Sequence, residues 1–249
     1  MRNEIIKILD EIEEMENIEI LYACESGSRV WGFANRQSDY DVRFIYKKRN
    51  VREYLSLKNS NDVIECIGDD FDIVGWDIKK ALKLHFKDNP NLREWFLSSE
   101  VYIDKGINNI FSDLGEFNID VLKNHYASIA LKHWKKYCNL EFKHDKTKKY
   151  LYVIRAILCW NLLNLNIYPP INIWELMDHE NIKLNDDIRD AVFELVMFHQ
   201  GNGDLTEETI LKLNNFILSS LSSMKTVHVE SHKELMNYDE RFRELLLVS

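Results

Sequence analysis

Residues 25–43 read ESGSRVWGFANRQSDYDVR, and this stretch decides the fold that we expect. The apolar run Ile18–Cys24 precedes it and predicts a buried strand. Gly27 then permits backbone conformations that other residues avoid, which predicts a tight turn at Gly27–Ser28. The alternating run Asp39–Tyr46 predicts a second strand. The stretch therefore reads as strand, turn, short helix and strand.

Two acids begin the second strand. Asp39 and Asp41 would point to the same face, because side chains alternate along a strand. Two carboxylates ~4 Å apart repel by roughly 4 kcal/mol at an effective dielectric of about 20. Mg²⁺, or Mn²⁺ in its place, would relieve that repulsion and could be shared with the phosphates of an NTP. The pair predicts a metal site, whereas a solvated strand end is the plainer interpretation.

The turn before these acids supplies the other half of the expected site. Backbone N–H groups and the Ser28 hydroxyl at a helix start are suited to phosphate oxygens. Either feature alone is common in proteins without a nucleotide site. Gly27–Ser28 and the two acids at this spacing together predict metal-dependent nucleotide chemistry.

A third carboxylate should come from a neighbouring strand. We favour Asp72 in the segment FDIV, because an acid between apolar strand residues has no simple packing reason. It could bind metal and accept the proton of an attacking hydroxyl. Asp77 is the rival, although it is also well placed to cap a helix at residues 78–86.

The two halves of the chain differ in their expected structure. The first half predicts a helix at residues 4–15, further strands at Val63–Ile67 and Phe71–Trp76, and a helix at Asp77–Phe86. From about Asn118 the chain is helix-periodic and poor in strand formers. We expect an α+β protein with a catalytic domain at 1–118 and an all-helical domain at 119–249. The helices expected there are Asp120–Leu140, Lys146–Leu165, Asp186–Gln200, Thr206–Leu221 and Ser231–Leu246.

The bulk composition indicates a soluble cytoplasmic protein. The four cysteines are far apart, no signal peptide is recognisable, and the longest apolar stretch, Tyr150–Leu163, contains Arg155 and is too short to span a bilayer. We therefore expect no membrane partner. A net charge of −9 argues against a long nucleic-acid groove, yet residues 132–149 hold seven lysines.

Two groups of basic residues are candidates for nucleotide contacts. Lys148, Tyr152 and Arg155 share one helical face, where a ring between cations could stack a base. Arg43 shares a strand face with Asp41 and could touch a phosphate or simply balance the carboxylates. A solvated basic face and a structural ion pair are the respective alternatives.

The order of these motifs resembles the GS-x(n)-DxD signature of the DNA polymerase beta-like nucleotidyltransferase superfamily. More narrowly, the segments ESGSRVWGFA, SDYDVRFIY, GWDIKKAL and NPNLREW resemble the predicted nucleotidyltransferase family linked with RNA-repair pathways, over about residues 20–165. The resemblance implies metal at Asp39 and Asp41, triphosphate at Gly27 and Ser28, and a third carboxylate at Asp72. It also implies a nucleotide-facing helix around Lys148–Arg155.

These features predict a metal-dependent nucleotidyltransferase. It would move an NMP from an NTP to an acceptor hydroxyl and release pyrophosphate, by positioning and electrostatics. The acceptor stays open between an RNA end, a protein and a small molecule. A nucleotide-binding sensor on the same fold is the alternative, and a glycosyltransferase with a DxD pair is a weaker one. The presence of all three acids favours catalysis.

Overall fold

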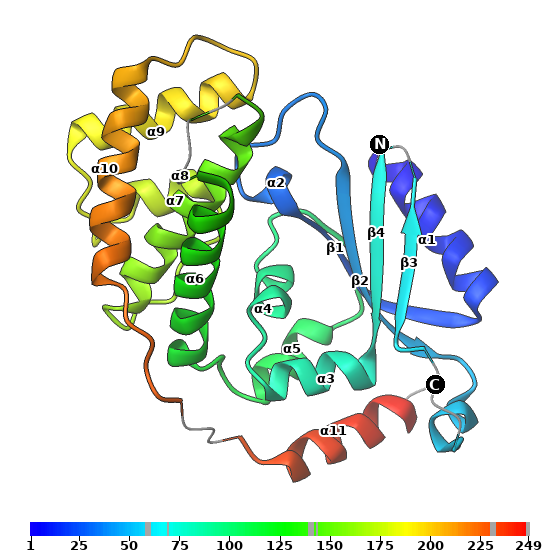
Figure 1. Ribbon diagram of the computed structural model, residues 1–249. Coiled ribbons are helices and arrows are strands. Elements are labelled where there is room, and N and C mark those ends of the chain that lie inside the picture. The colour runs from blue at the N-terminus through cyan, green and yellow to red at the C-terminus, as the bar shows by residue number, and fades with distance from the viewer. Residues whose placement is uncertain (58–60, 69, 139–141, 143, 230–232, 248–249) are drawn as a thin grey trace. The chain divides into compact units, whose positions relative to one another are not determined.

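The structure is a computed structural model that describes residues 1–57, 61–68, 70–138, 142, 144–229 and 233–247. The chain forms two compact units (Figure 1). The first, here the sheet unit, comprises Met1–Val30, Ser38–Phe117 and Ser231–Ser249. The second, the helical unit, comprises Trp31–Gln37 and Asn118–Glu230.

This division differs in two places from the domains that the sequence predicts. The sheet unit gives way to the helical unit after Phe117, and α11 (Leu235–Leu247) belongs to the sheet unit. Residues Trp31–Gln37, inside the motif of the first domain, belong to the helical unit. Periodicity shows that a segment is helical but not which core its apolar face will cover.

The sheet unit is built on a five-stranded mixed sheet in the order β3-β4-β2-β1-β5. β2 and β4 run parallel, and the other neighbours are antiparallel. The α+β class is therefore confirmed. The short β5 was not expected from the sequence. The strands are β1 (Ile18–Ser26), β2 (Tyr40–Lys48), β3 (Val63–Ile67), β4 (Phe71–Asp77) and β5 (Val101–Asp104).

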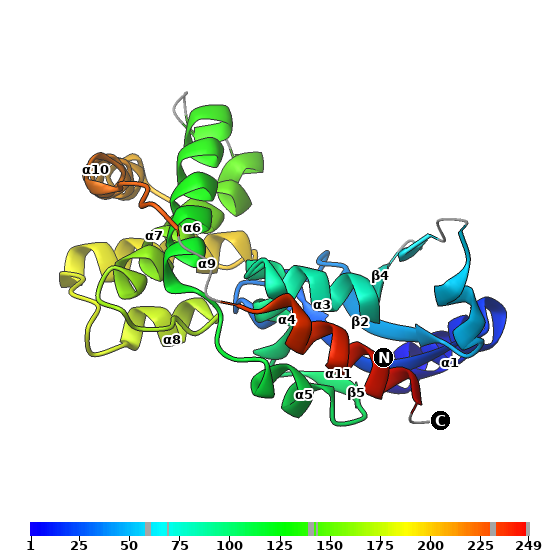
Figure 2. The ribbon, with the colours of Figure 1, turned by 90° about the horizontal axis from the view of Figure 1, so that it is seen from below.

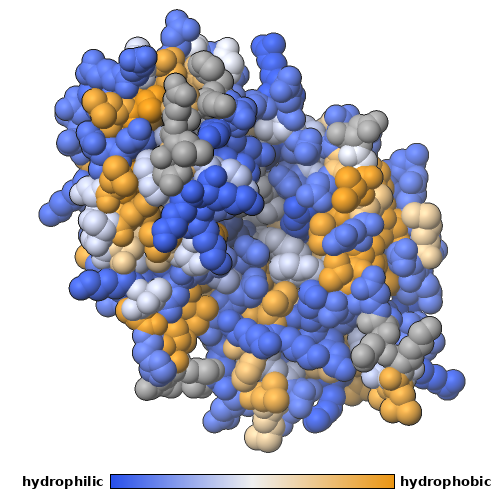
Figure 3. All heavy atoms as spheres, viewed as in Figure 1, coloured by the Kyte–Doolittle hydropathy of each residue, from blue (hydrophilic) through white to orange (hydrophobic). Residues whose placement is uncertain are grey.

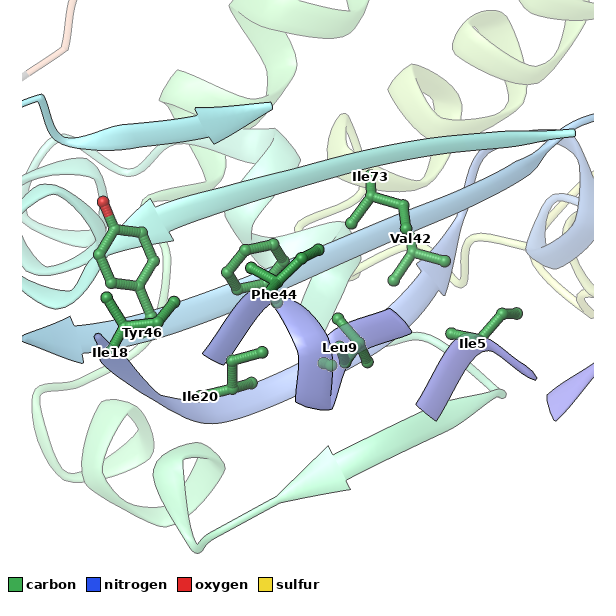
Figure 4. Close-up of a cluster of buried hydrophobic side chains, with 10 residues drawn as sticks. Ile5, Leu9, Ile18, Ile20, Val42, Phe44, Tyr46 and Ile73 are labelled. Carbon is green, nitrogen blue, oxygen red and sulfur yellow. The ribbon is translucent and has the colours of Figure 1, made fainter. Parts of the chain in front are cut away.

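One face of this sheet is covered by α1 (Arg2–Glu16). Ile5 and Leu9 of the helix pack against Val42, Phe44 and Ile73 from the strands (Figure 4). Strand side chains alternate between the two faces. Because Val42 and Phe44 point toward α1, the intervening residues of β2 point to the opposite face.

The C-terminal end of β4 leads directly into α3 (Ile78–Phe86). Asp77 is the N-cap residue of this helix, and its Oδ1 accepts the N–H of Lys79 at 2.8 Å. Its Oδ2 accepts the hydroxyl of Tyr54 at 2.9 Å. Both oxygens of the rival third carboxylate are thus used in the structure of the fold.

The remaining elements of the sheet unit are short. They are α2 (Gly27–Val30), a 3-10 helix at Val51–Leu55, α4 (Pro90–Phe96) and α5 (Ile107–Asp113). Hydrophobic side chains gather on the surface over β3 and β4 (Figure 3), where the edge strand β3 leaves Ile67 exposed.

The helical unit follows the predicted periodicity closely. The described helices are α6 (Ile119–His133), α7 (Thr147–Leu163), α8 (Ile173–Asp178), α9 (Asp186–His199) and α10 (Glu207–Ser223). α6 is shorter than expected and continues as a π-helix at Trp134–Cys138, while the predicted end at residues 139–140 lies outside the described part. A 3-10 turn at His144–Lys146 precedes α7. Within the described residues, no helix combines the length and apolar composition that crossing a bilayer requires.

α11 lies along α3 in the sheet unit (Figure 2) and is tied to it by polar contacts. The ring Nδ1 of His85 and the hydroxyl of Tyr238 are 2.6 Å apart. Lys233 donates to the His85 carbonyl at 2.9 Å and pairs with Asp88 at 2.7 Å. His85 is only 1% exposed, and burial, reinforced by Lys233, lowers its pKa to about 3.

This buried imidazole predicts acid sensitivity of the sheet unit. The unfolded chain binds a proton at His85 below about pH 6.5, whereas the folded chain does not. The contribution is complete above pH 6.5 and falls by about 1.4 kcal/mol per pH unit as the pH drops. Urea unfolding between pH 7.5 and 5 should therefore show a shallower pH slope in His85→Gln. His228→Gln, at an exposed position, should keep the wild-type slope, and equal slopes in both variants would contradict the assignment.

Candidate active site

The pairing of β2 with β4 brings two acids side by side. In this parallel register Asp41 lies opposite Asp72, on the face away from α1. Neighbouring strands are about 4.8 Å apart, so two such carboxylates are close neighbours. The side chains are 24% and 38% exposed, respectively. The structure thus gives a pair of partly accessible carboxylates from adjacent strands.

Arg43 lies between these acids on the same face. Its Nη2 donates to Asp41 Oδ1 and to Asp72 Oδ2, each at 2.9 Å. Its Nη1 donates to the Asp72 carbonyl at 2.6 Å. Only 17% of the side chain is exposed. These contacts agree with the ion-pair interpretation of Arg43, which balances the two carboxylates and joins their strands.

Asp39 is placed differently from the expectation. It lies one residue before β2 and is exposed, so the alternation that relates strand residues does not extend to it. Its carbonyl accepts the Arg29 Nε at 3.2 Å. In the described part of the chain its carboxylate joins no hydrogen bond or ion pair, and no three potential ligands lie close enough together to hold a metal ion. Its role as a metal ligand stays a prediction.

The glycine–serine turn lies directly against Asp41. Gly27 opens α2 with a φ of +64°, in the left-handed region. A Cβ placed on Gly27 would come within 1.9 Å of Asp41 Oδ2. Ser28, which follows, is buried. Glycine is therefore required at position 27 both by its backbone conformation and by the carboxylate beside it.

Glu25 is a site residue that the sequence analysis missed. It is 2% exposed, and its Oε1 accepts the backbone N–H of Asp41 at 3.1 Å. Its Oε2 accepts the Tyr102 hydroxyl at 2.5 Å, and Arg29 Nε lies 3.8 Å from Oε1. Burial raises the pKa of Glu25 against the opposing effect of these contacts. An acid at the end of the apolar run ILYAC was the available signal, the same one that singled out Asp72.

The basic residues predicted on α7 are held within the helical unit. Arg155 is buried, donates from Nε to the Ile171 carbonyl at 2.7 Å and lies 4.5 Å over the Trp31 ring. Lys149, rather than the predicted Lys148, lies over the Tyr152 ring at 5.3 Å. Arg155 therefore lies inside the unit, and nucleotide binding by Lys148, Tyr152 and Arg155 stays a prediction.

Comparisons with known proteins place this chain in a family. Residues 1–247 match the RNA repair pathway DNA polymerase beta family. The chain is 39% identical over 185 residues to the uncharacterized protein YcgL of Bacillus subtilis (strain 168), covering 72% of this chain and 69% of that protein. The crystal structure of a nucleotidyltransferase-like protein from Exiguobacterium sibiricum 255-15 aligns with 98% of this chain and 79% of that one. The TM-score of this alignment is 0.35, and the sequences are 12% identical.

The mixed sheet, with carboxylates on two adjacent strands beside a glycine–serine turn, defines a module of the nucleotidyltransferase type. With a family match that extends over nearly its whole length, the chain belongs to the RNA repair pathway DNA polymerase beta family. The family resemblance read from the sequence is confirmed.

The contact at Gly27 predicts a selective effect of Gly27→Ala. The added methyl group would displace the Asp41 carboxylate. The left-handed backbone conformation would also cost an alanine about 1 kcal/mol. Gly106→Ala is a matched control, because its φ is +85° and nothing lies within 4 Å of the added carbon. Thermal unfolding should shift in both variants. Nucleotidyltransferase activity should be lost only in Gly27→Ala, and equal activity in the two would contradict the steric argument.

The buried Glu25 predicts opposite results for two substitutions. Glu25→Ala leaves the Asp41 N–H and the Tyr102 hydroxyl without this acceptor, which should cost about 2 kcal/mol of stability and about tenfold in activity. Glu25→Gln can accept from Asp41 and donate to Tyr102. A raised carboxyl pKa means that stability falls as pH rises through it, so this variant should be at least as stable as wild type at pH 7.5. Thermal unfolding tests both, and equal destabilisation would refute the assignment.

Proposed function

We propose that this protein transfers an NMP from an NTP to an acceptor hydroxyl and releases pyrophosphate. The observation that supports this most directly is the in-register pair of Asp41 and Asp72 against the Gly27–Ser28 turn. Membership of a DNA polymerase beta family supports the same reaction class. The reduced thiols and the NTP requirement favour a cytoplasmic setting.

The carboxylates suit a hard divalent cation. They offer partly exposed oxygen ligands on adjacent strands of a single face, which is the donor chemistry of Mg²⁺ and Mn²⁺. Asp41 and Asp72 would hold the ion, with Asp39 as the further ligand that the family resemblance implies. When bound, such an ion would neutralise phosphate charge and favour ionisation of the acceptor hydroxyl.

The residues of the chain would divide the reaction among them. The Gly27–Ser28 turn would hold the triphosphate so that the α-phosphorus faces the acceptor. The acceptor oxygen forms a bond to that phosphorus as the bond to the bridging oxygen breaks, and pyrophosphate leaves with the electron pair. Asp72, the more exposed carboxylate, would take the hydroxyl proton and return it to solvent. Arg43 would hold both carboxylates in position.

A sensor that binds nucleotide without turnover is the second candidate. Arg43 neutralises both carboxylates through protein contacts alone, so the fold does not need a cation to tolerate the pair. A sensor would be stabilised by NTP yet release no pyrophosphate. An enzyme would do both, and measuring the two with one preparation separates these functions.

Substitution of the paired acids tests the proposal. Asp41→Asn and Asp72→Asn should each lower Mg²⁺-dependent pyrophosphate release at least 100-fold, because each removes a charge facing the reacting phosphates. The assay would offer each of the four NTPs with RNA, protein or small-molecule acceptors, and would follow label from the nucleotide. Asp10→Asn, on the exposed surface of α1, is the charge-matched control. Full activity in Asp41→Asn, with circular dichroism unchanged, would disprove the assignment.

A further inference from the structure

The helical unit carries a lysine-rich surface that the proposed reaction leaves without a role. We call it the lysine surface and define it by Tyr137 and six described lysines. Lys132, Lys135 and Lys136 are exposed on the end of α6 and the π-helix. Lys146, Lys148 and Lys149 are half-buried at the start of α7.

The acids that the structure describes near this surface do not balance its charge. Within the described part of the helical unit, none of these lysines takes part in an ion pair. By contrast, Lys212 elsewhere in the unit pairs with Glu208 at 2.9 Å. In a chain of net charge −9, residues 132–149 contain seven lysines against Glu141 and Asp145. A local field of this kind attracts an anionic partner.

An aromatic ring lies among the ammonium groups. The Lys136 and Lys149 nitrogens are 4.9 Å and 5.2 Å from the centre of the Tyr137 ring. A hydrogen bond from Lys136, aided by the charges of Lys136 and Lys149 and opposed by burial, lowers the pKa of the Tyr137 hydroxyl. The ring is partly exposed and therefore offers a surface on which a planar group can stack.

The aromatic groups continue inward from Tyr137. Its ring is 5.5 Å from that of His133, which is 5.6 Å from Tyr152. Burial, followed by the charges of Lys149 and Lys136, lowers the pKa of His133 and favours its neutral form. The π-helix at Trp134–Cys138 sets the position of Tyr137, and such π turns occur frequently at functional sites.

The combination of ammonium groups and aromatic rings favours a nucleic acid over an acidic protein as the anionic partner. An acidic protein surface would be attracted by the lysines alone and would gain little from a partly exposed ring between them. A nucleic-acid strand uses both, because phosphates pair with the ammonium groups and unpaired bases stack on aromatic side chains.

We infer that the lysine surface binds a single-stranded nucleic acid, with Tyr137 stacking one base and Lys136 and Lys149 contacting the flanking phosphates. Resting on the proposed function, the inference favours a polynucleotide as the acceptor, because a nucleic-acid strand carries a terminal hydroxyl of the kind that the reaction uses.

Binding is measured by fluorescence anisotropy of a labelled 12-nucleotide RNA, in EDTA and without NTP, across a range of salt concentrations. The double variant Lys136→Ala/Lys149→Ala should lower the salt slope by about 1.4 and the affinity about tenfold or more. Tyr137→Ala should lose about tenfold in affinity, and Tyr137→Phe should retain it. A DNA strand of the same sequence distinguishes the two sources of such a strand, and heparin provides a polyanion that has no bases.

The control double variant is Lys183→Ala/Lys225→Ala, which removes the same charge from exposed positions of the helical unit. It should bind nearly as well as wild type. Equal losses in the two double variants, or heparin binding as sensitive to Tyr137→Ala as RNA binding, would overturn the inference. Because the assay contains neither metal nor NTP, an absence of RNA binding with intact pyrophosphate release would refute only this surface. RNA binding without pyrophosphate release from any NTP would refute the proposed reaction.

Discussion

The parallel pairing of β2 with β4 is the constraint on which the candidate site depends. It places Asp41 and Asp72 side by side, and their repulsion is relieved in the folded chain by the guanidinium of Arg43. Without Arg43, the repulsion between the two carboxylates would destabilise the strand pairing that brings them together. Arg43 therefore contributes to the fold and to the site at once, since the same contacts join two strands and hold two carboxylates in place.

The immediate surroundings of Asp41 are set by the end of β1 and the turn that follows it. Gly27 leaves room for its carboxylate, and Glu25 accepts its backbone N–H. Both precede Asp41 on the neighbouring strand or at its end, so the β1–β2 pairing carries the turn to the acid. The buried carboxylate of Glu25 is unfavourable by itself. It is tolerated because the Asp41 N–H and the Tyr102 hydroxyl donate to it and Arg29 lies nearby.

The sequence was sufficient for the local elements and insufficient for what joins them. Alternation and helical periodicity predicted β1, β2, β4 and α3, and the capping tendency of aspartate anticipated the position of Asp77. The sequence favoured Asp72 as the third carboxylate, but its register opposite Asp41 depends on pairing between distant segments, which no local pattern encodes. Asp39 was expected on the same strand face as Asp41, but β2 begins one residue later, at Tyr40. Likewise, the 3.6-residue period of α11 could not show that it packs on α3.

The same limit applies to the basic residues of α7. Spacing alone placed Lys148, Tyr152 and Arg155 on one face, but Arg155 meets the Ile171 carbonyl and the Trp31 ring within the unit. A guanidinium placed in this way packs on Trp31 and uses its Nε within the unit. The lysines at the end of α6 and the start of α7 lie where long side chains can direct their ammonium groups to solvent. Overall acidity and a local cationic surface are therefore compatible, because a Debye length of about 8 Å confines the influence of each charge to its own neighbourhood.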